Sequence, residues 1–201
     1  MLTILDVKVY DLFESVIASG NAMRLEPVEY TQEEFQKGLK RMARLVKTSQ
    51  SGNIHCHDNA LTGIRVSIDL KYPQYWSMEF QRYHFADIVT SSSKMHRLCK
   101  MDLSRSCNKY VDSRVLEVMR EKVEKYNQDQ TYENFMNVIS NCPMGLELFM
   151  RVSTNYKQLQ TIYFQRKNHK LQEDWGAFCK MIEDLPYFKE LILGEYEEDQ
   201  K

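Results

Sequence analysis

Cysteine pairs, long apolar runs and an excess of either charge are all missing from this sequence. Its 201 residues include five cysteines, an odd number, with no Cys-x-x-Cys motif. Free thiols are therefore expected, as in proteins kept in a reducing compartment. No apolar run approaches the ~18 to 20 residues of a membrane span, and the N-terminus lacks the basic and apolar pattern of a signal peptide. We therefore expect a soluble, cytoplasmic protein with no membrane partner.

The charge balance excludes a general attraction to polyanions. The formal net charge is −1, so any basic site must be local and no nucleic-acid partner is predicted. With 43% apolar residues, no internal repeat and no low-complexity linker, the chain should form one domain over residues 1–201. Within it we expect a sheet-containing half with a serine-rich anion loop (1–110), a helical half (111–193) and a frayed acidic tail (194–201).

One cluster of potential metal ligands is present, the triplet His55-Cys56-His57. Adjacent residues of a strand point to opposite faces, and no second ligand pair follows at zinc spacing. The sequence therefore predicts no metal site.

The first half should hold strands and two amphipathic helices. Imperfect alternation predicts a strand over residues 2–9, followed by a short helix to Ala18, and strict alternation predicts a strand over 64–70. A capping box at Thr31 should start a helix that ends before Ser49. Residues 72–85, with Pro73 in the first turn, should form a helix with more aromatic surface than one buried stripe needs.

The second half has helical patterns throughout. Helices are expected over residues 113–126, 132–140, 145–151, 153–166, 173–185 and 187–193, with Thr131 and Thr154 among the caps. In the helix over 153–166, Asn155 and Arg166 are eleven residues apart, so both side chains should look the same way about 16 Å apart. An amide and a guanidinium so placed could hold two ends of a nucleotide. The alternative is that Arg166 only pairs with a carboxylate on a solvated face.

The pattern Asn155-x-Lys157-x-Leu159, then Arg166, His169 and Gln172, resembles the C-terminal signature of the flavin-dependent thymidylate synthases. That signature reads Asn-x-Arg-x-[Leu/Phe] and ends in an Arg that grips the nucleotide. A second stretch also matches, because Pro73 stands nine residues before Arg82, as in the family. There the family's Arg-His-Arg is replaced by Arg82-Tyr83-His84.

The central family motif is eroded. The family continues with Ser, Asn-Glu, Ser and Arg-Tyr, whereas this chain has a serine-rich segment followed by basic residues. Without a gap, Ser92 and Lys94 take the positions of the family's Ser and Arg. With one inserted residue, Ser93 takes the Ser position and His96 that of the Tyr. Neither register recovers the Asn-Glu pair. The segment is either an anion-binding turn or an ordinary serine-rich loop with solvated basic flanks.

The resemblance implies an α/β (α+β) fold, a twisted, mainly antiparallel sheet surrounded by helices with a helical C-terminal half. It also implies a homotetramer with sites between subunits, and FAD, with reduced nicotinamide and methylene-folate needed only if the chain methylates deoxyuridylate. The implied catalytic residues are Ser92, Ser93 and Arg166. The implied cofactor-binding residues are His57, Arg82, His84, Asn155 and Lys157, although His57 also fits an ordinary loop histidine. The implied substrate-binding residues are Ser92, Ser93, Lys94, Arg97, Arg166 and Gln172.

Two other functions remain open from the sequence. A chain without the family's Arg-His-Arg and Asn-Glu could bind or sequester a pyrimidine nucleotide without catalysis, as a phage-borne factor would. It could also be a purely structural oligomer.

Overall fold

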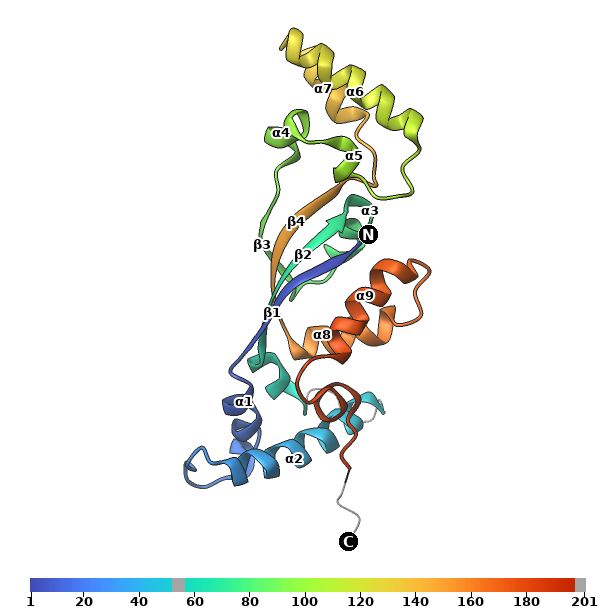
Figure 1. The fold of residues 1–201 in the computed structure, drawn as a ribbon. Helices are drawn as coiled ribbons and strands as arrows, with labels where there is room; N and C mark the ends of the chain where they lie inside the picture. The colour runs from blue at the N-terminus through green and yellow to red at the C-terminus, as the bar shows by residue number, and fades with distance from the viewer. Residues whose placement is uncertain (52–56, 198–201) are drawn as a thin grey trace.

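The computed structural model describes residues 1–51 and 57–197. In it an antiparallel sheet forms the middle of an elongated molecule (Figure 1). Its strands are β1 (Thr3–Tyr10), β2 (Arg65–Pro73), β3 (Asp87–Ser91) and β4 (Glu147–Asn155), in the order β1-β2-β4-β3. The expected mainly antiparallel sheet with surrounding helices is confirmed. No helix of the described residues is long and apolar enough to cross a bilayer.

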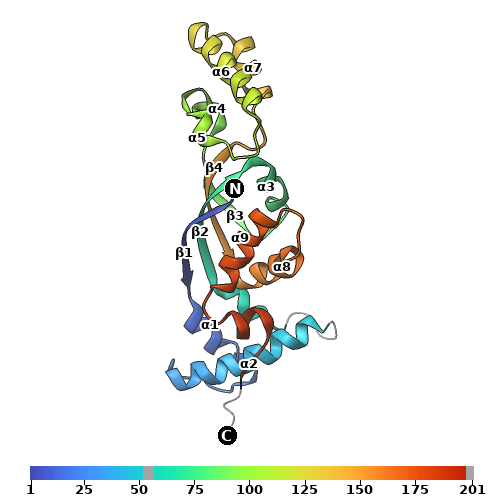
Figure 2. The ribbon, with the colours of Figure 1, turned by 45° about the vertical axis from the view of Figure 1, so that its right-hand side comes forward.

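Helices lie at both ends of the sheet and over one of its faces (Figures 1 and 2). One end carries α1 (Leu12–Ala18) and α2 (Gln32–Gln50), and the other carries the hairpin of α6 (Ser113–Gln128) and α7 (Tyr132–Ser140). The covered face packs against α8 (Tyr156–Arg166) and α9 (Gln172–Glu183). Shorter elements are α3 (Gln74–Phe80), α4 (Lys94–Arg97), α5 (Leu103–Ser106), the 3-10 turns η1 (Asn21–Met23), η2 (Asn59–Gly63) and η3 (Leu98–Lys100), and the π-helix η4 (Lys189–Leu193).

The core lies between the sheet and its covering helices. Val66, Ile68 and Leu70 of β2 are at most 1% exposed, which is the alternation the sequence predicted. Behind them Trp76 of α3 stacks on Phe80 and contacts Trp175 of α9, all three fully buried. Aromatic surface of this size supplies a large share of the burial that drives folding. Much of the aromatic surplus in residues 72–85 is therefore used inside the chain.

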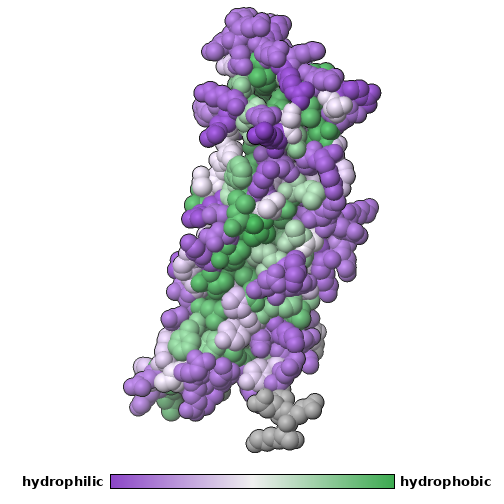
Figure 3. Space-filling view, viewed as in Figure 1, coloured by the Kyte–Doolittle hydropathy of each residue, from purple (hydrophilic) through white to green (hydrophobic). Residues whose placement is uncertain are grey.

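The opposite face of the sheet has no covering layer. Figure 3 shows hydrophobic side chains gathered in a band over the sheet, between hydrophilic ends. On this face Leu5, Val89 and Phe149 are 54%, 59% and 51% exposed. Leu5 and Val89 both stand where the strand register shifts, between Ile4 and Asp6 in β1 and between Ile88 and Thr90 in β3. Each is the extra residue of a β-bulge, one in each edge strand.

Most of the predicted helices are confirmed. Thr31 caps α2, where Glu34 N–H donates to its hydroxyl at 3.2 Å, and Thr131 caps α7 in the same way through Asn134. The helix expected over 72–85 is shorter, because β2 continues through Tyr72 and Pro73 before α3 begins. A residue before proline prefers the extended conformation, which favours this boundary.

The helix predicted over residues 145–151 is wrong. That stretch contains most of β4, whose Leu148, Met150 and Val152 are buried while Phe149 and Arg151 face the open side. Buried and exposed side chains alternate along this stretch with the period of two that is typical of a strand, and β2 and β3 pair with it on either side. The sheet therefore takes a central strand from the half of the chain that was expected to be helical.

The start of the helix predicted over 153–166 is also corrected. β4 runs through Asn155, and α8 begins only at Tyr156. Thr154 is not the cap: its hydroxyl donates to the carbonyl of Phe85 at 2.8 Å, and its side chain is buried in the sheet.

Four cysteines, Cys99, Cys107, Cys142 and Cys179, carry free thiols, as predicted, whereas Cys56 lies outside the described residues. Burial raises the pKa of Cys107 and of Cys179 from the ordinary value near 9 to about 11. At pH 8 their thiolate fraction should thus be about a hundredfold below that of a free cysteine.

We expect alkylation of Cys107 and Cys179 to be slow in the native protein and fast after denaturation, measured by mass spectrometry of iodoacetamide adducts. Because the two thiols keep their protons to higher pH in the folded state than in the unfolded state, the free energy of unfolding should fall as pH rises above 9. Equal native and denatured rates would contradict this assignment.

Two helical glycines provide a matched stability test. A Cβ on Gly38 of α2 would lie 2.7 Å from the carbonyl oxygen of Val16, whereas a Cβ on Gly176 of α9 would meet no atom within 4 Å. Replacing glycine by alanine favours a helix by about 1 kcal/mol, but overpacking against backbone costs about 1–3 kcal/mol. We expect Gly38→Ala to lower the free energy of unfolding by about 1–2 kcal/mol and Gly176→Ala to raise it by about 0.5–1 kcal/mol. Urea denaturation of both variants measures this, and a stabilised Gly38→Ala would show that α1 and α2 are not packed this closely.

Candidate functional site

The junction of β4 and α8 is the centre of the candidate site. Asn155 is both the last residue of β4 and the cap of α8, since its Oδ1 accepts the Gln158 N–H at 2.9 Å. Tyr156 N–H then donates to the carbonyl of Ile64 at 3.1 Å, which ties the helix start to the turn before β2. The chain therefore passes from β4 into α8 without a loop. The first turn of α8 is held by the side chain of Asn155 and by the carbonyl of Ile64.

The predicted cofactor-binding residues lie on the segments that meet at this junction. Asn155 and Lys157 belong to the junction itself. Arg82 and His84 are exposed and lie within three residues before Phe85, whose carbonyl accepts the Thr154 hydroxyl. His57 is exposed and directly precedes Asp58, the partner of Lys157. Neither Arg82 nor His84 forms an ion pair with any other residue that the structure describes.

Lys157 is held by a buried carboxylate. Its Nζ donates to Asp58 Oδ2 at 2.5 Å and to Gln160 Oε1 at 3.2 Å. Asp58 is 0% exposed, and its second oxygen has no hydrogen-bond partner among the described residues. A buried carboxylate is stable only when it is paired. Lys157 therefore stabilises the fold, in addition to any contact that it makes with a ligand.

The serine-rich segment lies at the other end of β4. Ser92 accepts the Phe149 N–H on its hydroxyl at 3.2 Å, and Ser93 caps α4 by accepting the His96 N–H at 3.4 Å. Neither hydroxyl donates to another residue that the structure describes. Lys94 and Arg97 follow in α4 and have no carboxylate partner within the part of the chain that the structure describes.

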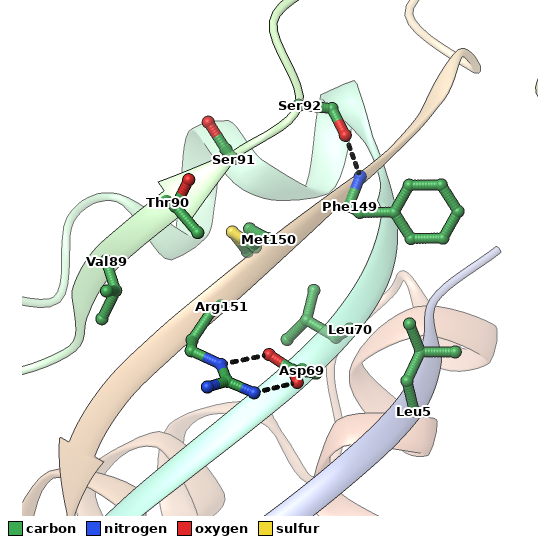
Figure 4. A pocket seen from close by; sticks show the side chains of 10 residues that line it. All are labelled: Leu5, Asp69, Leu70, Val89, Thr90, Ser91, Ser92, Phe149, Met150 and Arg151. Carbon is green, nitrogen blue, oxygen red and sulfur yellow. Dashed lines mark hydrogen bonds and ion pairs between the residues drawn. The ribbon is translucent and has the colours of Figure 1, made fainter.

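A groove of about 700 Å³ on the open face of the sheet adjoins this segment (Figure 4). Arg151 at its centre binds Asp69 in a forked ion pair, with Nε donating to Oδ1 at 2.6 Å and Nη2 donating to Oδ2. The arginine holds the pKa of the Asp69 carboxyl below its ordinary value. Around the pair lie Leu5, Val89, Thr90, Ser91, Ser92 and Phe149. The groove thus combines hydroxyl donors, an aromatic ring and a neutralised charge pair.

Arg166 lies at the last turn of α8, inside a cluster of side chains from α3, the turn after α3, α8 and α9. Its Nε donates to the Tyr83 hydroxyl at 2.7 Å, and its Nη1 donates to Glu79 Oε2 at 3.0 Å. Its guanidinium stacks 4.6 Å from the ring centre of Trp175, and Trp175 Nε1 donates to the same Glu79 oxygen at 2.9 Å. The carboxylate pairing considered from the sequence is therefore present, but in a half-buried aromatic setting and not on a solvated surface.

One chain does not bring all the predicted residues together. Ser92 lies beside Phe149, six residues from Asn155, so Ser92 and Asn155 are about 20 Å apart along β4. Gln172 is exposed at the start of α9, in a hollow of about 460 Å³ with Tyr75 and Asp174, and it is not part of the Arg166 cluster. The predicted residues thus form a junction set at Asn155, a serine set at Ser92 and the Arg166 cluster.

Three residues with relevant chemistry were not among those predicted from the sequence: Glu79, Phe149 and Arg151. Alternation over 147–155 would have placed Phe149 and Arg151 on one strand face, had that stretch been interpreted as a strand. Nothing in the local pattern marks Glu79, because its partners come from helices about ninety residues away.

No group of three or more His, Cys, Asp or Glu able to hold a metal ion is found among residues 1–51 and 57–197. His55 and Cys56 lie outside these residues.

Comparison with known proteins gives a likeness in structure only. No protein-family model and no curated protein matches the chain. Two solved structures of the flavin-dependent thymidylate synthase ThyX from Helicobacter pylori, both with FAD and dUMP, are similar to it. One has a TM-score of 0.65 and 16% identity over 94% of this chain and 98% of that chain. The other has a TM-score of 0.69 and 15% identity over 95% and 96%. The expected resemblance is thereby confirmed for the fold, over 94% and 95% of this chain in the two comparisons.

The Asp58–Lys157 pair can be tested by stability alone. Lys157→Met should leave the buried carboxylate unpaired and lower the free energy of unfolding by about 3 kcal/mol. Adding Asp58→Asn should restore most of that loss, because the buried charge is then gone. As a control, Lys180→Met removes an exposed pair with Asp184 and should cost less than about 1 kcal/mol. Chemical denaturation of the wild-type protein and the three variants gives the four free energies of unfolding. A loss in Lys157→Met no larger than that in the control would show that the pair does not stabilise the fold.

Proposed function

We propose that this chain binds a pyrimidine deoxynucleotide together with a flavin dinucleotide, at sites completed by a second copy. The observation that carries the proposal is that basic side chains without a carboxylate partner among the described residues lie near both ends of β4, Arg82 and His84 near one end and Lys94 and Arg97 near the other. Basic side chains free to bind, beside hydroxyl and amide donors, suit phosphate groups. They occur on a fold shared with structures that contain FAD and dUMP.

The serine set is the proposed phosphate site. Ser92 and Ser93 use their oxygens as acceptors within the chain and keep O–H groups to donate. Lys94 and Arg97 add two positive charges within one turn. Phe149 next to Ser92 offers a ring against which a pyrimidine can pack. These residues would hold the substrate by its charge and its ring.

The junction set fits the donor needs of a flavin dinucleotide. Asn155 uses its carbonyl oxygen for the helix cap and keeps its amide N–H groups. Arg82 and His84 are exposed and can face the diphosphate, while Lys157 is fixed by Asp58 at the start of α8. His57 lies on the adjoining turn. A reduced flavin bound there would supply a hydride, and the residues of the chain would bind and orient it.

A second copy is needed because the junction and serine sets are about 20 Å apart on one chain. A homo-oligomer, most simply the tetramer expected from the resemblance, would place the junction set of one copy near the serine set of another. Exposed Leu5, Val89 and Phe149 supply apolar surface for such an association.

Methylation of deoxyuridylate is the corresponding reaction, and it would require reduced nicotinamide and methylene-folate. A non-catalytic nucleotide-binding or sequestering protein is the second candidate. One observation favours it: Tyr83, the middle residue of the triplet Arg82-Tyr83-His84, is committed to internal contacts with Arg166 and Gln165. The family has a histidine at this place. A tyrosine whose hydroxyl is held by these contacts does not replace the function of that histidine.

Three measurements on purified protein separate these functions. Oxidised-flavin absorbance, or its appearance after FAD is added, supports the flavin site, and titration with deoxyuridylate tests the nucleotide site. Light scattering at micromolar concentration tests assembly. Nucleotide binding without flavin favours the sequestering protein, and a monomer that binds neither ligand would refute the proposal.

Arg166 provides the sharpest variant. A forked, charge-assisted contact is worth roughly 1.5–3 kcal/mol, so Arg166→Ala should weaken deoxyuridylate binding about ten- to a hundredfold. Arg166→Lys should not restore it fully, because an ammonium lacks the planar fork. Calorimetric titration measures both.

The control for this prediction is Arg24→Ala. Arg24 also pairs with a glutamate, Glu34, and its side chain is 16% exposed against 17% for Arg166. Arg24→Ala should lower the free energy of unfolding and leave the affinity for deoxyuridylate unchanged. Unchanged affinity in Arg166→Ala would exclude Arg166 from the nucleotide site.

A further inference from the structure

The segment between β3 and α6 carries a row of basic side chains, of which the proposed nucleotide site uses only the first part. α4 runs directly into η3, and Lys94, Arg97 and Lys100 stand three residues apart along this helical stretch. Side chains at this spacing lie along one side of a helix, with about 5–6 Å between neighbours. Arg97 and Lys100 are exposed and Lys94 is half-buried. We call these three residues the basic row, which is about 10 Å long.

The basic row keeps its positive charge. None of its three side chains has a carboxylate partner among the described residues. Residues 93–106 contain four Lys and Arg against one acidic residue, Asp102, and Asp102 pairs with Arg105 at 3.4 Å and not with the row. Beyond the row, Arg120 of α6 donates to the Ser104 hydroxyl and adds a further guanidinium. A local positive surface therefore exists on a chain whose formal net charge is −1.

The basic row leads away from the serine set. Ser92 lines the groove on the open face of the sheet, beside Phe149, and Ser93 caps α4, whose first residue is Lys94 (Figure 4). α4 and α5 lie between the end of the sheet and the hairpin of α6 and α7 (Figures 1 and 2). Leu98 is 1% exposed and anchors the stretch to the core. A ligand that starts in the groove can therefore continue along the row on a fixed surface.

The spacing of the row decides which anion fits it. The phosphates of a nucleoside di- or triphosphate share bridging oxygens and lie closer together than one helical turn. In a nucleic-acid strand a sugar separates successive phosphates, so each phosphate can meet a different member of the row. The strand has to be single, because a base that packs on Phe149 cannot remain paired. A free mononucleotide reaches only the start of the row and leaves Lys100 without a phosphate.

We infer that the basic row binds the phosphate backbone of a single-stranded nucleic acid, one pyrimidine nucleotide of which occupies the serine set. This rests on the proposed function and extends its ligand from a free deoxynucleotide to one joined to a strand. Lys94 and Arg97 bind the first phosphates, and Lys100 binds the next one. A cationic track beside an aromatic ring is the combination by which proteins hold single strands.

Lys100 provides the test, because a mononucleotide in the serine set does not need it. Deoxyuridylate is titrated by calorimetry, and a fluorescent oligodeoxyuridylate of about eight residues by anisotropy, into the wild-type protein and into Lys100→Gln. The oligonucleotide should bind the wild type at least about tenfold more tightly than deoxyuridylate does. Its log affinity should fall with log salt concentration with a slope of about −2, as expected for three contacts to a single strand.

Lys100→Gln should weaken oligonucleotide binding about three- to tenfold and change the slope to about −1.4, because one phosphate contact is lost. Its affinity for deoxyuridylate should stay unchanged. The control is Lys47→Gln. Lys47 is an exposed lysine of α2, at the other end of the molecule, and it also lacks a carboxylate partner within the part of the chain that the structure describes (Figure 1). The control should change neither affinity nor the slope, and thermal unfolding checks that both variants are folded.

The outcomes separate this inference from the proposed function. If the oligonucleotide binds no more tightly than deoxyuridylate, or if Lys100→Gln behaves like Lys47→Gln, the row does not bind a strand and the inference is overturned while the nucleotide function stands. If polyglutamate of the same charge binds as tightly as the oligonucleotide and depends equally on Lys100, the partner is an acidic polypeptide and the inference is again overturned. If deoxyuridylate does not bind, the proposed function fails and the inference fails with it.

Discussion

The pairing of β2 with β4 is the interaction on which the rest of the structure depends. Every residue from Arg65 to Pro73 faces one from Glu147 to Asn155. β4 is also the partner that holds β3 in the sheet. One end of β4 leads directly into α8, and the other lies beside the serine-rich segment. A single central strand therefore sets the distance between the two sets of polar residues that carry the proposed function.

The elements that could be predicted are those with a complete local signal. The strand over 64–70 alternates strictly, and the helix after Thr31 carries its own cap, so each was found with nearly correct limits. β4 was missed because Glu147, Leu148 and Met150 are good helix formers in isolation, and their strand partners lie about eighty residues earlier. Tertiary pairing outweighed local propensity there. Asn155 was predicted inside a helix, whereas it ends a strand and caps the helix that follows.

For the candidate site, the sequence indicated which residues carry charge but not which charges remain free. Arg166 and Lys157 were as prominent as Arg82 and Arg97, yet the fold gives the first two carboxylate partners from distant segments, Glu79 and Asp58. A guanidinium with a fixed partner reads shape and hydrogen-bond pattern, whereas one without a partner mainly attracts anions. The fold thus divides similar side chains into two chemical classes. This division follows from contacts that no short motif contains.

The bulges at Leu5 and Val89 also bear on how the protein avoids aggregation. Edge strands expose a row of backbone donors and acceptors that can template growth of a cross-β fibril. Here each edge strand carries an extra residue that breaks this row and bends the strand, and β3 is only five residues long. A foreign strand can therefore match neither edge over a useful length. The chain can keep an apolar sheet face available for ordered assembly while both of its edges resist indefinite polymerisation.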